Sequence, residues 1–408
     1  MKRYRLVRLF LIGLIFCTSP VIAQTFSFEQ GRNRDAIRFK LIHNLIIIPI
    51  YVNNAGPFNF ILDTGVGPLI ITDTSLGEFV ESGNHPLFRM RGRGIGPEIE
   101  AYVVNNLTAT VGRATISGFS GVLLKNDPFQ LSSYLGTPIH GIMGASFFKS
   151  FIVKVDYMNK RLSLYDHSRS VKKRGEKLEI DIIRDKPYTN IVVNTFDGKT
   201  DTLSMLVDLG AGHVVSLDLT NDEQFLKPDS TIIANLGMGL SGPISGLIGR
   251  LKGVKIGPFN FRNVIVAFPE YEDEFLRLLM TENDGSIGGG LLKRFTVLFD
   301  YSRQEIYLRK NKYYKMPFEH DMSGMEIYNS DKKNKRYFVS RIEPNSPAEK
   351  AKFMAGDEIL SINFKDAQAY SLEEINSLLQ KESTGVLVFE ILRDRQTYFK
   401  VITLKRRI

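Results

Sequence analysis

The sequence predicts a mainly β protein with two similar, strand-rich halves and a small α+β unit at the C-terminal end. Three observations lead to this prediction: a short apolar-Asp-x-Gly segment that occurs twice, glycine motifs that follow both copies at equal spacing, and a change of pattern after residue 310. Apolar residues make up 43% of the 408 residues and charged residues 24%, which allows sizeable hydrophobic cores.

The first half of the repeat is "FILDTGV" at residues 60–66, and the second is "MLVDLGA" at residues 205–211. Paired glycines follow 29 and 31 residues after each aspartate, in "GRGIGP" and "GMGLSGP". Further on, residues 140–165 match residues 284–308, with an offset of 144 against 145 at the aspartates. Three segments that keep register over so long a stretch indicate a duplication.

Both halves have the composition of strands. Short β-branched and aromatic runs such as "NLIIIPIYVN" and "YTNIVVNTF" end at Gly, Pro or Asn, and Asp156 and Asp300 sit at predicted hairpin turns. Residues 166–176 and 309–318 are candidate linkers. We therefore expect lobes at residues 24–170 and 171–312, followed by a separate domain at residues 316–408.

The C-terminal ninety residues combine strands with two short helices. The first helix should begin at Ser346 with Pro347 in its first turn, and the second should cover residues 371–381. Ser371 and Glu374, three residues apart, have the spacing of a capping box at the start of the second helix. These local signals predict a small α+β unit.

The first 23 residues have the layout of a secretory signal peptide. Basic residues precede a short apolar run, Leu9–Phe16, and small residues at Val21–Ala23 suit cleavage before Gln24. The run is shorter than the ~20 residues that span a bilayer, and no other segment reaches that length, so no integral membrane span is expected. Cys17 is the only cysteine, and its loss with the signal favours a bacterial periplasm, cell envelope or exterior.

Charge and histidine spacing exclude other classes. The signal supplies four of the nine net positive charges, which leaves +5 on a chain whose only compact basic run in its first 300 residues, 172–174, fits a solvated linker rather than a nucleic-acid site. The six histidines lack metal-ligand spacing, so neither metal nor cofactor is expected. His213 lies five residues after Asp208, where a loop role is favoured over that of a base.

A two-fold arrangement of the halves would bring Asp63 and Asp208 together. Two carboxyl groups about 3 Å apart cannot both ionise easily, so they share one proton. One carboxylate can then act as base on a water while the other donates to a substrate carbonyl. Gly65 and Gly210, two positions after each aspartate, permit the tight backbone that this approach requires.

These features resemble the aspartic proteases, over residues 38–310. The short lobes are closer to the retropepsin-like (retroviral) type of bacterial proteins, although two lobes in one chain are similar to the pepsin arrangement. The resemblance implies two pseudo-symmetric aspartic-protease-like β lobes, an aspartic endopeptidase with a peptide or protein substrate, and catalytic Asp63 and Asp208. It also implies that 141–144 and 285–288 are supporting loops and that 237–242 is a counterpart of the flap. The implied active-site turn consists of Thr64, Gly65, Leu209 and Gly210, and the implied flap of Gly92, Arg93, Gly94, Ile95 and Gly96.

Leu209 departs from this pattern. In the family the residue after each aspartate is Thr or Ser, whose hydroxyl bonds across to the other lobe; Thr64 can do this and Leu209 cannot. One lost hydrogen bond is worth about 1 kcal/mol and an unpaired buried partner ~1–3 kcal/mol, which corresponds to roughly one to two orders of magnitude in rate. The sequence thus leaves two alternatives open: a catalytic endopeptidase, or a non-catalytic or weakly active peptide-binding scaffold.

The C-terminal unit resembles a PDZ domain over residues 318–408, through "VSRIEPNSPAEKAKFMAGDEILSIN". Such domains bind an extended peptide by strand addition, often with its terminal carboxylate held by backbone N–H groups. The implied peptide-binding loop consists of Ser323, Gly324, Met325, Glu326 and Ile327, with residues 371–381 as the helix beside the peptide. The loop departs from the usual Gly-Leu-Gly-Phe pattern, so a C-terminal or an internal extended ligand remains open, as does a domain that only packs against the lobes.

Overall fold

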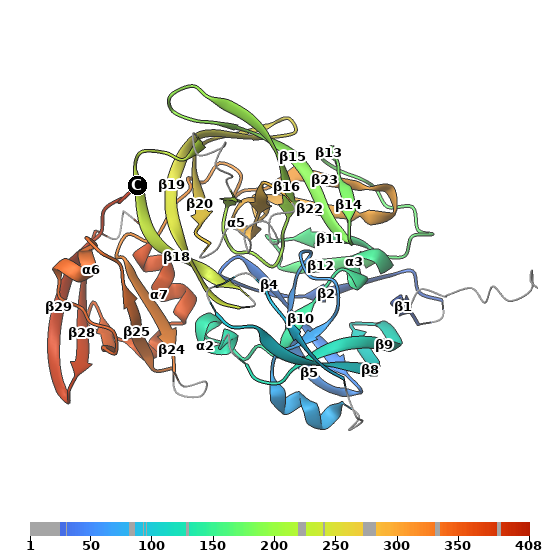
Figure 1. Cartoon of the computed structure of the whole chain (residues 1–408), viewed down its shortest axis with the longest axis horizontal. Coiled ribbons are helices and arrows are strands. Elements are labelled where there is room, and N and C mark those ends of the chain that lie inside the picture. Colours follow the sequence, from blue (N-terminus) through green and yellow to red (C-terminus); the bar gives the residue numbers. More distant parts are fainter. Residues whose placement is uncertain are drawn as a thin grey trace, which may run out of the picture.

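The computed structural model describes residues 25–29, 31–80, 86–92, 94, 96–127, 130–218, 226–239, 241–271, 283–330, 335–381 and 385–408. The predicted signal peptide, residues 1–23, lies outside these ranges, as do Arg93 and Ile95 of the predicted flap. Strands account for 52% and helices for 11% of the chain, so the predicted mainly β class is confirmed. Within the described ranges the strands form four sheets (Figure 1).

The first sheet belongs to the first half of the chain and has the strand order β1-β9-β6-β10-β5-β4-β8-β7, with β3 beside β4. Its strands are β1 (Ser27–Phe28), β3 (Lys40–Ile42), β4 (Leu45–Val52), β5 (Ala55–Leu62), β6 (Ile70–Ile71), β7 (Leu87–Met90), β8 (Ile99–Val111), β9 (Ala114–Leu124) and β10 (Gly141–Met143). Short helices η1 (Thr74–Phe79), α2 (Leu131–Leu135) and α3 (Ser146–Ser150) lie in its connections.

The second sheet has the order β14-β15-β16-β21-β17-β20-β19-β18. Its strands are β14 (Asp181–Ile183), β15 (Lys186–Asn194), β16 (Thr200–Val207), β17 (Val215–Leu217), β18 (Thr231–Gly239), β19 (Gly242–Ile256), β20 (Phe259–Pro269) and β21 (Gly285–Ile287), and α5 (Gly289–Leu292) follows β21. The same parallel pairing occurs in both sheets: β10 beside β5 with Met143 opposite Leu62, and β21 beside β16 with Ile287 opposite Val207. In each sheet, the strand that ends before an Asp-x-Gly turn therefore lies beside a strand that begins with glycine.

A bridging sheet joins strands from both halves in the order β13-β23-β22-β11-β12-β2. Its strands are β2 (Arg34–Arg38), β11 (Ile152–Asp156), β12 (Arg161–Tyr165), β13 (Glu176–Glu179), β22 (Phe295–Asp300) and β23 (Glu305–Lys310), and η3 (Tyr301–Arg303) links the last two. At its centre β11 runs antiparallel to β22, with Lys154 opposite Leu298. These two residues are 144 positions apart, the offset of the sequence repeat here, so equivalent positions of the two halves face each other across this pair.

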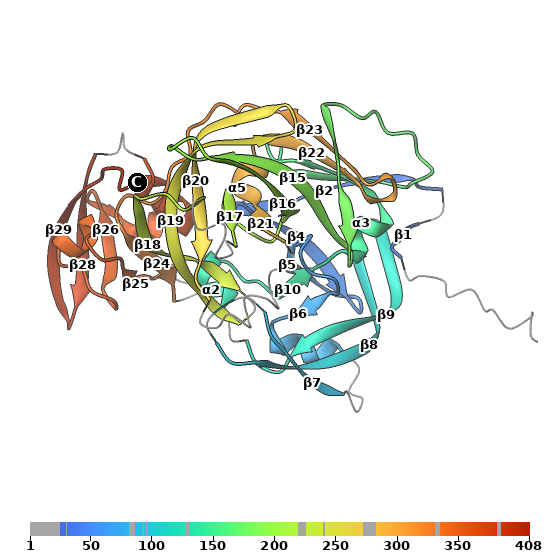
Figure 2. The same cartoon turned by 45° about the horizontal axis from the view of Figure 1, so that its top comes forward.

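The C-terminal sheet has the order β24-β25-β26-β28-β29, with β27 beside β26. Both Figure 1 and Figure 2 place it at one end of the molecule, beside β18. Its elements are β24 (Met325–Asn329), β25 (Tyr337–Ile342), α6 (Pro347–Lys350), β26 (Glu358–Ile362), β27 (Lys365–Asp366), η4 (Ala367–Ala369), α7 (Leu372–Leu379), β28 (Val386–Arg393) and β29 (Gln396–Thr403).

Both helix starts of the C-terminal unit are confirmed. Ser346 caps α6 and accepts a hydrogen bond from the Glu349 N–H, with Pro347 in the first turn. Ser371 and Glu374 form the predicted capping box at α7. The helix ends at Leu379, two residues earlier than predicted, and the Leu372, Ile375 and Leu379 side chains are buried in the unit's own hydrophobic core.

The segment between the second half and the C-terminal unit is bound to the protein surface beneath it. Arg294 is 3% exposed, and its guanidinium donates to the carbonyls of Tyr313 at 3.1 Å and Pro317 at 3.1 Å, and also to that of Met316. Its cationic carbon lies 3.6 Å from the centre of the Phe318 ring. Residues 309–318, expected as a linker, are therefore packed rather than a free tether.

We expect Arg294→Met to lower the free energy of unfolding by about 3 kcal/mol, because several partly buried carbonyls lose a charged donor. Urea unfolding measures this change, and limited proteolysis should show new cleavage within residues 309–318. Arg309→Met, at an exposed position of β23, is the matched control and should change stability by less than about 0.5 kcal/mol. Equal stability of the two variants would contradict the packed linker.

Candidate active site

The Asp63 and Asp208 turns have the same hydrogen bonds. Asp63 follows β5, its N–H donates to the Met143 carbonyl at 2.9 Å, and its Oδ1 accepts from the Gly65 N–H at 2.6 Å. Asp208 follows β16, its N–H donates to the Ile287 carbonyl at 2.9 Å, and its Oδ1 accepts from the Gly210 N–H at 2.8 Å. In both turns the backbone on either side therefore fixes the direction of the carboxyl group.

The two turns lie against each other. A Cβ atom added to Gly210 would lie 2.1 Å from Oδ2 of Asp63, and one added to Gly65 would lie 3.5 Å from Oδ1 of Asp208. The carboxyl group of each half thus packs against the turn of the other half. Any side chain at position 210 would displace the Asp63 carboxyl group, which explains in physical terms why glycine stands there.

Thr64 bridges the two turns through its hydroxyl group. The Oγ1 atom donates to the Val207 carbonyl at 2.6 Å and accepts from the Leu209 N–H at 2.9 Å, and the residue is fully buried. One side chain of the first half therefore binds the backbone on both sides of Asp208. This fixes the second aspartate relative to the first.

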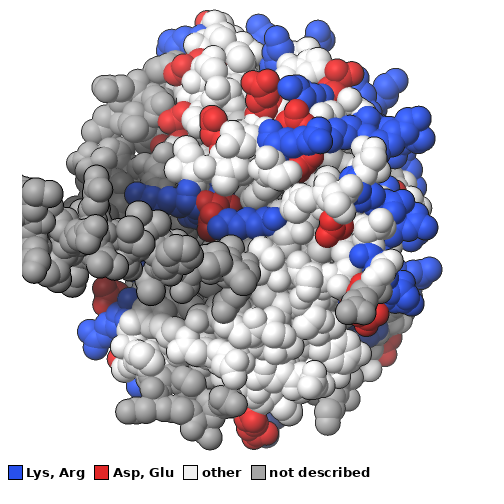
Figure 3. Space-filling model, turned by 90° about the vertical axis from the view of Figure 1, so that its right-hand side faces the viewer, with Lys and Arg blue, Asp and Glu red and all other residues white. Residues whose placement is uncertain are grey.

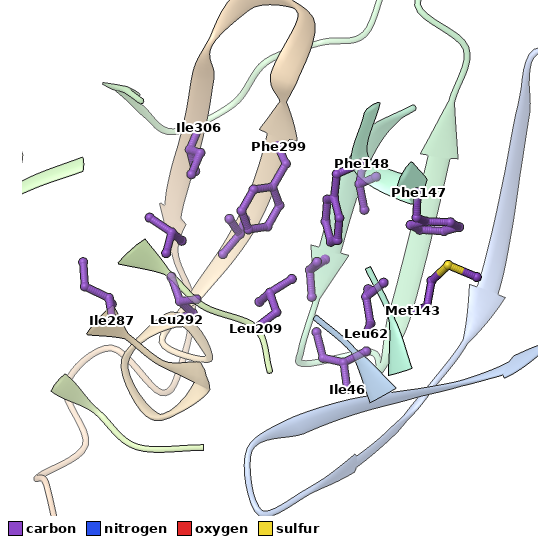
Figure 4. Close-up of a cluster of buried hydrophobic side chains, with 14 of the residues drawn as sticks. Ile46, Leu62, Met143, Phe147, Phe148, Leu209, Ile287, Leu292, Phe299 and Ile306 are labelled. Carbon is purple, nitrogen blue, oxygen red and sulfur yellow. The ribbon is translucent and has the colours of Figure 1, made fainter. Parts of the chain in front are cut away.

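Leu209 occupies the equivalent place but points into the hydrophobic core. Its side chain is fully buried, and Figure 4 shows it between Leu292 and Phe299 on one side and Leu62 and Phe148 on the other. An apolar side chain offers no hydrogen bond to the Asp63 turn. The bridging contact is therefore made by Thr64, as predicted, and Leu209 contributes packing instead.

The environment of Asp63 favours its protonated form. Burial, and after it the nearby Asp208 carboxyl, raise the pKa of Asp63 to about 8, against opposing contributions from the Gly65 N–H and Lys186. Both aspartates are only half-buried, so solvent still reaches the site. Tyr301, at the turn of the bridging sheet, lies close enough that both carboxylates add to the burial that raises its pKa.

The predicted flap and its counterpart are in contact. The Gly92 N–H donates to Oγ of Ser241 at 2.9 Å. Gly94, with φ of +125°, packs so closely on Gly242 that an added Cβ would lie 2.4 Å from the Gly242 carbonyl oxygen. Residues 92, 94 and 96 of the first half therefore meet the tip of the β18–β19 hairpin of the second.

The glycine segments after the flaps support the two turns. An added Cβ on Gly144 would lie 2.3 Å from the Val66 carbonyl oxygen, and one on Gly288 would lie 2.4 Å from that of His213. The His213 ring in turn is 2.9 Å from the Ser286 hydroxyl. The two loops pack alike against the chain just after each aspartate, and the contact of His213 is with a strand residue.

The loop predicted to bind a peptide carboxylate uses its own N–H groups internally. The Gly324 N–H donates to Oδ1 of Asp321 at 2.6 Å, and the Met325 N–H donates to Oγ of Ser323 at 3.1 Å. The Met322 N–H donates to the Leu379 carbonyl at the end of α7 at 3.0 Å. The side chain of Asp321 thus occupies the place where the resemblance puts a ligand carboxylate.

Asp321 was missed by the sequence reasoning. Burial raises its pKa to about 7, although the Ser323 hydroxyl and the loop N–H groups act in the opposite direction. The available signal was an aspartate just before Ser-Gly, in "DMSG", a pattern typical of a side chain that binds backbone N–H groups of its own turn. Met325, Glu326 and Ile327 of the predicted loop belong to β24 instead.

Three further features of the described residues concern metal ligands, membrane helices and surface charge. Within the described ranges no group of three or more His, Cys, Asp and Glu side chains could hold a metal ion, and no described helix is long and apolar enough to cross a membrane. Figure 3 shows one face, where Lys and Arg are interspersed with Asp and Glu. Lys173, from the basic run at 172–174, pairs with Asp300 at 3.0 Å and Glu305 at 2.7 Å.

Comparison with protein families identifies a PDZ domain at residues 338–393. The match extends from β25 to the end of β28, and β24 and β29 complete the same sheet on either side. The comparison with curated proteins found no match. The chain therefore carries a peptide-binding type of domain at its C-terminal end. The mainly β body that precedes it in sequence contains the two juxtaposed Asp-x-Gly turns.

We expect Thr64→Val to lower the free energy of unfolding by about 3 kcal/mol, because the Val207 carbonyl and the Leu209 N–H both lose a buried partner. Thr64→Ser keeps the hydroxyl group and should recover most of this loss. Urea unfolding of both variants measures the difference. If valine and serine proved equally stable, the bridging role of the hydroxyl would be wrong.

The raised pKa of Asp63 predicts how stability depends on pH. Between the ordinary value of 3.8 and about 8, the folded state binds a proton that the unfolded state has lost, so stability is greatest below pH 4 for this group and falls as pH rises through 8. The slope is at most about 1.4 kcal/mol per pH unit.

Asp63→Asn removes this titration, so the variant should gain in Tm over the wild type as pH rises from about 4 to about 8. Thermal unfolding across this range measures the gain, with Asp201→Asn at a half-buried position of β16 as the control. A Tm difference that stays constant with pH would contradict the raised pKa.

Proposed function

We propose that the protein is an aspartic endopeptidase in which Asp63 and Asp208 form the catalytic dyad. The observation that carries the proposal is the Thr64 bridge, which joins two identically bonded Asp-x-Gly turns from the two halves of the chain. The strand pairings common to both sheets and the shared bridging sheet support two aspartic-protease-like lobes around one site.

The dyad would work with one shared proton. The Asp208 carboxylate takes a proton from a water whose oxygen attacks the peptide carbonyl carbon, while Asp63 gives its proton to the carbonyl oxygen. The tetrahedral intermediate then collapses: the C–N bond breaks, Asp208 gives its proton to the leaving nitrogen, and Asp63 takes a proton from one hydroxyl of the intermediate as the C=O bond re-forms. One shared proton is again left on the pair. The raised pKa of Asp63 suits this role at neutral pH, because its proton is present there.

The PDZ domain would recruit peptides or proteins for the endopeptidase. An extended segment can add to the edge of β24, which is the end strand of the described C-terminal sheet. Because Asp321 already binds the loop N–H groups, recognition would depend on the main chain of an internal segment rather than on a terminal carboxylate. The signal-like residues 1–23 favour action outside a bacterial cytoplasm.

The dyad is tested by incubating residues 24–408 with a diverse peptide library between about pH 4 and about pH 9. We expect cleavage that falls as pH rises through about 8, where Asp63 loses its proton. Asp63→Asn and Asp208→Asn should each lower kcat by about a hundredfold or more. Asp156→Asn, at a hairpin turn of the bridging sheet, is the matched control. Cleavage that survives in both dyad variants would sink the proposal.

Leu209 favours a second candidate, a peptide-binding scaffold without turnover. Its side chain gives the Asp63 turn no hydrogen bond from the second half. This candidate requires that the wild type show no cleavage that depends on Asp63 and Asp208. A Leu209→Thr variant separates weakened from lost catalysis: increased turnover would mean that the endopeptidase is retained at reduced rate.

A further inference from the structure

The edge of β24 and the neighbouring helix α7 form the face on which a PDZ domain takes up a peptide strand. In this chain the face is turned toward the body of the molecule. The short helix α2, from the first half, lies against β24 (Figure 1). Residues far apart in sequence therefore stand where an added strand would lie.

Three contacts fix α7 and β24 to the body. Gly136, which ends α2 with φ of +64°, is so close to α7 that an added Cβ would lie 3.1 Å from Cβ of Leu372. The Asn376 amide nitrogen of α7 is 2.9 Å from Nε2 of His43. The Asn235 amide of β18 donates to Oε2 of Glu326 on β24 at 3.1 Å.

The contact is partly buried. Burial lowers the pKa of His43 to about 4, so its ring is neutral at physiological pH. The ring stands edge-on to Tyr134 of α2 with 5.2 Å between centroids. Burial and then the Glu326 carboxylate raise the pKa of Tyr134 to about 12. The His43–Tyr134 ring pair, the Asn376 amide and the Gly136 end of α2 thus form one continuous contact between α2, β24 and α7, which we call the seam.

We propose that residues 131–136 occupy the peptide-binding face of the PDZ domain, so that an extended peptide can add to β24 only after this segment has been released. The inference rests on the proposed peptide recruitment by the domain and concerns its regulation. The two occupants exclude each other because each needs the same edge of β24 and the same side of α7.

The segment that would move is directly connected to the dyad. Oγ of Ser132 in α2 accepts from the Ile139 N–H at 3.0 Å, and the His140 carbonyl accepts from the Thr72 N–H at 3.0 Å. Strand β10 follows at once, and its Met143 carbonyl accepts from the Asp63 N–H. The segment that covers the PDZ face and the strand that positions Asp63 therefore belong to one continuous stretch of chain, residues 131–143.

Hydrogen exchange of residues 24–408 tests the docking directly. The double variant His43→Ala/Asn235→Ala removes contacts on the body side and leaves the PDZ domain unaltered. We expect residues 325–329 and 372–379 to exchange about tenfold faster than in the wild type, with β28 and β29 unchanged. The control pairs an exposed histidine and an exposed asparagine elsewhere, His167→Ala/Asn260→Ala. Unchanged exchange in the first variant would overturn the proposal.

A disulfide lock tests the exclusion. Gly136→Cys/Leu372→Cys places two thiols across the seam, and the mature chain has no other cysteine. Peptides from a random 12-residue phage library are selected on His43→Ala/Asn235→Ala in an Asp63→Asn background, which prevents cleavage. They should bind that variant at least about tenfold more tightly than the oxidised lock, and the reduced lock should regain affinity.

Equal affinity for the open and the locked protein would overturn the proposal, and so would a failure to select any peptide on the open variant. Neither outcome depends on turnover by the dyad. The proposed endopeptidase is judged separately, from cleavage of the peptide library by the wild type.

Discussion

The arrangement of the two Asp-x-Gly turns depends on the hydrogen bonds of the Thr64 hydroxyl group. A single buried oxygen bonds the backbone before and after Asp208, and it does so from the half of the chain that carries Asp63. The two carboxyl groups can lie together only because this bridge and the bare backbone of Gly210 allow it. Burial, and after it the repulsion between the carboxyls, raise the pKa of Asp63, and the hydrogen-bonded turns hold the two groups together against this repulsion.

The asymmetry between Thr64 and Leu209 divides two tasks between equivalent positions. A threonine on each side would bind across the axis twice, whereas this chain uses one side for hydrogen bonding and the other for the hydrophobic core. The bridging sheet likewise combines equivalent backbone positions of the two halves with different side chains. Lys154 of β11 and Leu298 of β22 are equivalent residues that lie opposite each other, and their side chains differ.

Local and periodic features could be predicted from the sequence. The mainly β class, the caps at Ser346 and Ser371, and the coarse identity of the C-terminal unit as a PDZ domain all follow from residues close together in the chain. The repeated Asp-x-Gly segments could be found because a duplication preserves spacing.

Contacts between distant segments could not be predicted in this way. No sequence feature near Arg294 indicates that its guanidinium binds carbonyls within residues 313–317. The contact of Gly136 with Leu372 likewise brings together two segments whose sequences show no relation to each other. Asp321 is an intermediate case, since its turn is local but its burial is set by the domain around it. Such contacts depend on tertiary packing, which produces no periodic pattern in the sequence.

The contacts of Arg294 with the linker have a consequence for substrate length in the proposed endopeptidase. A recruitment domain on a flexible linker would present captured chains over a range of distances, whereas one held by these partly buried carbonyl contacts would keep the distance nearly constant. The span between a segment held at β24 and a bond cut at the dyad would then be constant. Short peptides could not reach both places, so the geometry would select long or unfolded polypeptides and cut them at a set interval from the captured segment.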